Sequence, residues 1–156
     1  MGRELPIDRV DREILAELQK DGRQTITELS EKVRLSISRC QRRLRELERA
    51  GVIRGYKAVL DPEAMGLGFE ALVFVTLQRE DQSTLAAFDE AVAAIPNVLQ
   101  AQRLFGDPDC LLHVVAVDLA DYRKLYEGQL TRLPGVQKLT STIVMKHIVE
   151  ARPLPT

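Results

Sequence analysis

Residues 36–51 read SISRCQRRLRELERAG, and this pattern predicts a single helix with one apolar and one cationic side. Ser36 is a suitable N-cap, because its hydroxyl can accept a hydrogen bond from a free amide of the first turn. Gly51 stands where a left-handed residue commonly follows a helix. The apolar residues recur at i, i+4 and i+7 and therefore share one face: Cys40, Leu44 and Leu47.

The same segment carries five arginines and two glutamates, so its net charge is +3. At about 100° per residue, several of the arginines fall on the side opposite the apolar face. The arginine fork suits phosphate oxygens and the edge of guanine, so we interpret the segment as a recognition helix for the major groove of DNA. A solvated charged face is the alternative for this helix taken alone. The DNA contacts that we predict are Ser36, Ser38, Arg39, Arg42, Arg43 and Arg45, with Arg54 beyond the helix.

Two further helices are expected before this one. Asp8 is placed to cap a helix over about residues 9–21, and Thr25-Ile26-Thr27-Glu28 matches a capping box at the start of the next. The apolar stripes of all three helices can converge on one small core. Helix, helix, tight turn and helix form a helix-turn-helix, in which the third helix enters the groove. A three-helix bundle that docks an acidic protein is the alternative.

The chain after Gly51 contains β-branched residues, which favour a strand up to Pro62 and make the front half winged-helix-like. We expect a helix-turn-helix domain over residues 1–60, a hinge over 61–70 and a second domain over 71–156. Charge supports this division, because residues 1–60 hold 14 Lys and Arg against 10 Asp and Glu, whereas residues 61–156 hold 8 against 13. Only the front half is therefore expected to meet a polyanion.

The back half alternates between strand and helix patterns in the order βαββαβ. This order predicts an α+β, ferredoxin-like domain, a four-stranded antiparallel sheet with both helices on one face. The face without helices needs a cover, so we expect a symmetric dimer; either Val73, Val75 and Leu77 or the alternating set faces the partner. The expected strands are 71–78, 98–105, 110–117 and 136–148, the helices are 82–95 and one capped by Asp118, and a tight hairpin spans residues 106–109.

Composition and cysteine usage restrict the class of protein. Hydrophobic residues make up 45% and charged residues 29% of 156 positions, as in soluble globular proteins. No apolar run reaches the roughly 20 residues of a membrane span, and the N-terminus lacks a signal-peptide core, so a cytoplasmic protein is expected. Cys40 and Cys110 lie outside any CxxC, and His113 and His147 are isolated in the sequence. We expect no enzyme, no metal and no cofactor.

Several segments resemble the Lrp/AsnC (feast/famine) family of transcriptional regulators. They cover almost the whole chain in the family's order, and their spans are 11–15, 18–23, 28–30, 33–36, 42–48, 51–56, 106–109, 132–136 and 140–145. The resemblance implies a DNA-binding regulator that forms homodimers and often an octamer. It also implies an amino acid or related metabolite as effector, which changes assembly or DNA affinity. A metabolite-binding oligomeric scaffold without DNA binding is the alternative.

The resemblance further places an effector pocket where the hairpin of one subunit meets neighbouring subunits. An aspartate there suits an ammonium group, and loop amides and hydroxyls suit a carboxylate. Pro108 and Cys110 depart from the family pattern and alter the donors and the size of this pocket. A plain turn and strand-forming threonines are the alternative reading. The implied residues are Gly106, Asp107 and Asp109 of the hairpin and Thr140, Ser141 and Thr142 of a facing strand.

Overall fold

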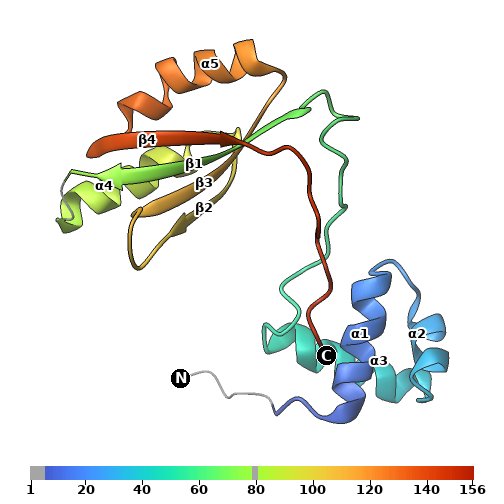
Figure 1. Cartoon of the computed structure of the whole chain (residues 1–156). Helices are drawn as coiled ribbons and strands as arrows, with labels where there is room; N and C mark the ends of the chain where they lie inside the picture. The colour runs from blue at the N-terminus through green and yellow to red at the C-terminus, as the bar shows by residue number, and fades with distance from the viewer. Residues whose placement is uncertain (1–5, 79–80) are drawn as a thin grey trace. The chain divides into compact units, whose positions relative to one another are not determined.

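The computed structural model describes residues 6–78 and 81–156, and the chain divides into two compact units (Figure 1). The front unit comprises Met1–Ala58 and the C-terminal segment Ile148–Thr156, and the back unit comprises Val59–His147. The C-terminal segment was expected in the back domain. It belongs to the front unit, where Gln19 of the first helix donates to the backbone oxygen of Leu154 (3.1 Å) and accepts from its amide (2.6 Å).

Three helices form the front unit, and each begins where the sequence predicts a cap. Helix α1 spans Arg9–Lys20, α2 spans Ile26–Lys32 and α3 spans Ile37–Arg49. The side chains of Asp8, Thr25 and Ser36 each accept a hydrogen bond from the amide three residues on. The first two caps are reciprocal boxes, which satisfy two free backbone donors each. The predicted helix-turn-helix is therefore confirmed.

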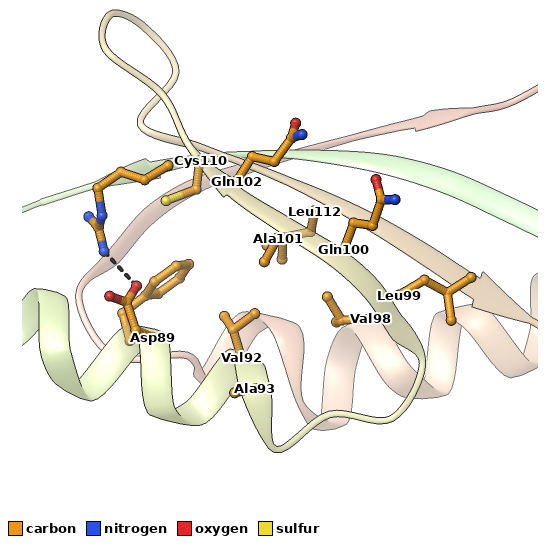
Figure 2. A pocket seen from close by; sticks show the side chains of 12 residues that line it. Asp89, Val92, Ala93, Val98, Leu99, Gln100, Ala101, Gln102, Cys110 and Leu112 are labelled. Carbon is orange, nitrogen blue, oxygen red and sulfur yellow. Dashed lines mark hydrogen bonds and ion pairs between the residues drawn. The ribbon is translucent and has the colours of Figure 1, made fainter. Parts of the chain in front are cut away.

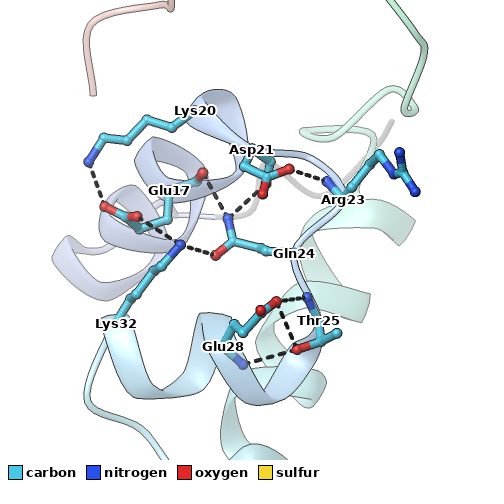
Figure 3. A network of polar contacts seen from close by, with 8 residues as sticks. All are labelled: Glu17, Lys20, Asp21, Arg23, Gln24, Thr25, Glu28 and Lys32. Atoms are coloured by element: carbon cyan, nitrogen blue, oxygen red, sulfur yellow. Dashed lines mark hydrogen bonds and ion pairs between the residues drawn. The ribbon is translucent and has the colours of Figure 1, made fainter.

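Polar contacts hold the turn between α1 and α2 (Figure 3). The Gln24 side chain donates to the backbone oxygens of Glu17 (2.9 Å) and Asp21 (2.8 Å), which lie at the open C-terminal end of α1. Lys20 and Lys32 both approach the Glu17 carboxylate, and the Lys20 contact (2.6 Å) is the main cause of the lowered pKa of Glu17. The Gln24 amide thus adds a donor at the C-terminal end of α1, where the Glu17 oxygen also accepts from the Asp21 amide at 3.1 Å.

The helical core is small and apolar. Its fully buried members come from all three helices, so the three predicted apolar stripes do converge; they are Ile14, Leu29, Val33, Cys40 and Leu47. Around them pack half-buried residues that include Leu44 and Ile53. This core orients α3, because the face carrying Cys40 and Leu47 is fixed inward and the opposite face is left to solvent.

The strand expected between Val52 and Pro62 is absent from these residues, and that prediction was wrong. The amides of Val52 and Ile53 instead bond to the Leu47 oxygen at 3.0 and 3.2 Å and close the end of α3. A strand needs a neighbouring strand for its backbone hydrogen bonds, and none in the described chain pairs with this segment. Gly51 has φ +72°, as expected of the residue that follows the helix.

The back unit confirms the predicted βαββαβ order. Its strands are β1 (Phe69–Leu77), β2 (Val98–Arg103), β3 (Cys110–Ala116) and β4 (Val136–Ile143), and its helices are α4 (Gln82–Ala93), α5 (Leu119–Gly128) and the short η1 (Leu130–Arg132). All pairings in the sheet are antiparallel, in the order β2-β3-β1-β4. Strand β4 is shorter than expected and ends at Ile143 rather than Ile148. No helix of the described residues is long and apolar enough to cross a membrane.

Both helices cover the same face of this sheet. The alternate β1 residues Ala71, Val73 and Val75 are fully buried against side chains of α4 and α5 that include Phe88 and Tyr122. The other β1 residues are only half-buried and form the opposite face, which we call the open face: Glu70, Leu72, Phe74 and Thr76. Of the two sets that the sequence left as alternatives, the set without Val73 is therefore the uncovered one.

Candidate functional site

The exposed side of α3 gathers most of the predicted DNA contacts. Ser36, with its side chain used as a cap, stands at the start of this side. The side is slightly hollowed over one run of residues: Ser38, Gln41, Arg42, Arg45, Glu46 and Arg49. Arg39 and Arg54 are exposed as well. Apart from Arg43, the structure thus leaves every predicted DNA-contacting side chain at the surface or at the helix start.

Arg43 is the exception, because its guanidinium turns toward α1. It donates to Asp8 Oδ2 at 2.7 Å and to Asp11 Oδ1 at 2.8 Å, and its side chain is only 26% exposed. These hydrogen bonds raise the pKa of Arg43, with Asp11 contributing most. The Asp11 amide, and after it the Arg43 guanidinium, lower the pKa of Asp8. Arg43 therefore fixes α3 against α1, and its contact with phosphate stays a prediction that this pairing disfavours.

The two glutamates of α3 also have partners. Glu46 accepts from Arg42 at 3.1 Å, and Glu48 accepts from the Tyr56 hydroxyl at 3.0 Å. Burial, followed by the hydrogen bond to Glu48, raises the pKa of Tyr56 to about 12. Arg45 and Arg49 are exposed, with no acidic partner among the ion pairs of the described residues. The solvent side of α3 is consequently cationic, as an approach to phosphate requires.

The hairpin between β2 and β3 contains two aspartates, and one of them forms hydrogen bonds that fix the hairpin to β1. The side-chain oxygen Oδ2 of Asp109 accepts from the Leu77 amide at 2.7 Å. The Asp109 backbone amide donates to the Val75 backbone oxygen at 3.0 Å, and its backbone oxygen accepts from the Leu104 amide at 2.8 Å. Asp109 thus joins the hairpin to the end of β1, where the pairing of β1 with β4 shifts register. Asp107 is exposed at the tip, beside Gly106 with φ +143°.

The three predicted residues of β4 do not share a face. Thr140 pairs with Phe74 and Thr142 with Leu72, so both threonines lie on the open face, because directly opposed residues of antiparallel strands point the same way. Ser141 points to the helices and contacts the Tyr122 hydroxyl at 2.5 Å. Ser141 is therefore a contact to α5, and its expected place beside the threonines is corrected. Period-two alternation in the sequence would have separated it from them.

Within one chain, β1 lies between the hairpin strand β3 and β4. The hairpin residues and the two threonines therefore do not come together in a single subunit. A pocket built from both groups requires a second copy of the chain, as the predicted position between subunits already implies.

The two histidines are isolated in sequence but adjacent in the fold. His113 Nε2 lies 2.5 Å from Glu70 Oε1, and His147 Nε2 lies 2.7 Å from Glu70 Oε2. The three residues border a hollow on the open face, and sequence reasoning missed this cluster because its members come from β1, β3 and the segment after β4. No group of three or more His, Cys, Asp or Glu among residues 6–78 and 81–156 is arranged to hold a metal ion.

Comparisons with known proteins agree with this architecture. Residues 7–54 match a family model described as winged helix-turn-helix DNA-binding, and residues 70–154 match the Lrp/AsnC ligand binding domain. The chain is 39% identical over 148 residues to the leucine-responsive regulatory proteins of Escherichia coli K12 and Klebsiella pneumoniae, across 95% of this chain and 90% of each relative.

Solved structures give the same result. A transcriptional regulator from Neisseria meningitidis, solved as a complex with L-Met, superposes with a TM-score of 0.90 at 38% identity, over 95% of this chain and 96% of that one. An AsnC family transcriptional regulator from Agrobacterium tumefaciens superposes with a TM-score of 0.89 at 34% identity, over the same shares.

Proposed function

Because the chain belongs to the Lrp/AsnC family and is a DNA-binding transcriptional regulator of that type, we propose that it reads duplex DNA with the exposed side of α3. The observation that carries this proposal is the division of the arginines of α3. Arg43 is used inside the domain, whereas Arg39, Arg42, Arg45 and Arg49 stay at the surface.

Base readout comes from the start of the helix, through Ser38, Arg39 and Arg42, and phosphate contacts come from Arg42, Arg45 and Arg54. Base contacts carry the sequence preference, and phosphate contacts carry the salt dependence. Arg42 first has to exchange its exposed contact with Glu46 for a DNA group. That exchange costs little free energy, because exposed ion pairs at i, i+4 contribute little to stability.

The test is a binding titration of the purified protein with the DNA upstream of its own gene, followed by fluorescence anisotropy over a range of salt concentrations. Arg42→Ala is expected to weaken specific binding by about 1–3 kcal/mol, and Arg45→Ala to reduce the salt slope by about one. Arg123→Ala is the matched control, because it removes an exposed arginine paired at i, i+4 in the back unit. Wild-type affinity in both α3 variants would contradict the assignment.

The back domain responds to an amino acid in this proposal. Its support is the match to a ligand-binding domain and the L-Met bound by the similar Neisseria regulator. Gly106 and Asp107 at the hairpin tip, with Thr140 and Thr142 of another copy, supply an ammonium acceptor and carboxylate donors. Asp109 shapes this loop rather than meeting the ligand, because one of its oxygens is already bonded to Leu77.

A homodimer formed through the open face accompanies this function, and dimers assemble further, up to an octamer. The support is that Leu72 and Phe74 are half-buried, while α4 and α5 both pack on the other face of the sheet in the described residues. A dimer also supplies two recognition helices for a two-fold DNA site. A thermal-shift screen of the common amino acids tests the ligand, since binding to the native state raises its apparent stability.

A further inference from the structure

A hollow of the back unit runs between helix α4 and the edge strand β2 (Figure 2). Its volume is about 420 Å³, which is within the usual range for small-molecule sites. Apolar side chains from three elements line most of it: Phe88, Val92 and Ala93 of α4, Val98 and Ala101 of β2, and Leu112 of β3. We call this hollow the α4–β2 groove. It is complete within one chain, unlike the pocket at the hairpin.

One end of the groove carries a pair of opposite charges. Arg103 of β2 reaches across to Asp89 of α4, with 2.5 Å between Nη2 and Oδ1, and the dashed line at Asp89 in Figure 2 marks this contact. The pair is accessible to solvent, because the Arg103 side chain is 39% exposed and that of Asp89 is 64% exposed. An exposed pair contributes little to stability, so it can open without disrupting the domain.

These two features match the two halves of an apolar α-amino acid. Its head group carries one positive and one negative charge on the same carbon, and its side chain is hydrophobic. The ammonium group pairs with Asp89, the carboxylate accepts the forked donors of Arg103, and the side chain lies along Ala101 and Val92. On binding, one ion pair within the protein is replaced by two ion pairs with the ligand. Every charged group in the groove therefore keeps a partner of opposite charge.

We propose that the α4–β2 groove is a binding site for a free α-amino acid with an apolar side chain, separate from the hairpin pocket. This inference rests on the proposed function in one respect, namely that the back domain binds an amino acid. It concerns a different site from the hairpin pocket, and this site is formed by a single copy of the chain.

The test is isothermal calorimetry of the full chain with L-methionine and L-leucine, and with butylamine and pentanoate as probes that carry only one of the two charges. Ala101→Phe fills the groove from an exposed strand position. Its matched control is Ala86→Phe, the same substitution at an exposed position of α4 that does not line the groove. The double variant Asp89→Arg with Arg103→Asp keeps an ion pair but reverses its direction.

The expected result is that Ala101→Phe and the reversed pair each lower the affinity of the groove for the amino acid by roughly tenfold or more, while Ala86→Phe binds as wild type does. The single-charge probes are expected to bind at least about tenfold more weakly than the amino acids. Circular dichroism verifies the fold, and the reversed pair still decides the question if Ala101→Phe does not fold.

Two outcomes overturn the proposal and are distinguishable. If wild type binds the amino acids and both groove variants bind them equally well, the groove is not the site, and the proposed function stands. If wild type binds none of the amino acids, both the groove site and the amino-acid response fail together.

Discussion

The Arg43 guanidinium of α3 donates to the Asp11 carboxylate of α1 at 2.8 Å, and Asp11 is only 6% exposed. A nearly buried carboxylate requires a partner, because desolvation without compensation is costly. The same contact joins the first helix to the recognition helix, which are 32 positions apart in the sequence at these residues. Arg43 therefore sets the orientation of the surface that carries the other arginines.

Arg43→Ala is expected to destabilise the front unit by about 1–3 kcal/mol, because it leaves the Asp11 carboxylate with an unsatisfied acceptor. Urea unfolding followed by circular dichroism measures this change. Arg9→Ala is the matched control, since Arg9 also pairs with a carboxylate but is 92% exposed, and it should alter the midpoint little. Equal midpoints for the two variants would show that the Asp11 contact does not stabilise the domain.

The two aspartates of the hairpin should behave differently. Asp109→Ala removes the acceptor of the Leu77 amide and is expected to destabilise the back unit by about 1–3 kcal/mol. Asp107→Ala, at the exposed tip, is expected to keep wild-type stability and to weaken the effector response at the hairpin pocket. Thermal unfolding and ligand titration of both variants separate the two roles. A stable Asp109→Ala protein would contradict the structural role of that carboxylate.

The hydroxyl of Tyr56 gives the front unit a dependence on alkaline pH. Its folded pKa of about 12 lies above the usual value, so folding favours the protonated phenol. This stabilisation is fully present below about pH 10 and is lost as the pH rises toward 12. Tyr56→Phe should therefore remove one late-titrating group from the absorbance titration and flatten the loss of stability in that window. Tyr126→Phe, which leaves Tyr56 and its contact with Glu48 intact, should retain both features.

The open face supplies a direct test of association. Leu72→Glu places a charge among half-buried residues of β1, and a partner covering this face would have to bury that charge. We expect sedimentation to show monomers for Leu72→Glu and dimers or larger assemblies for wild type. Leu119→Glu, at a 59% exposed position of α5, is the control and should leave the dimer intact. If both variants formed dimers, the open face would not be the dimer interface.

Apart from the strand expected before Pro62, the sequence by itself determined the main helices and strands of this protein and their order. Each helix cap accepts a hydrogen bond from an amide only three residues away, as the side chains of Asp8, Thr25 and Ser36 do. The apolar periodicity of each helix is likewise visible within a few turns of sequence. For the same reason the βαββαβ order of the back unit and the cationic side of α3 could be predicted, since both depend on local patterns and on the short list of ways in which they assemble.

Tertiary structure decided which polar side chains remain available. Arg43 and Arg42 are neighbours of the same type, yet only Arg43 meets a carboxylate from a distant helix. Asp109 is used by the Leu77 amide, and Ser141 turns to α5 while Thr140 faces away from it. Ion pairs and hydrogen bonds of this kind depend on partners tens of residues away, so local patterns do not encode them. The segment after Gly51 lacks a strand for the same reason, because a strand forms only where another strand completes its backbone hydrogen bonds.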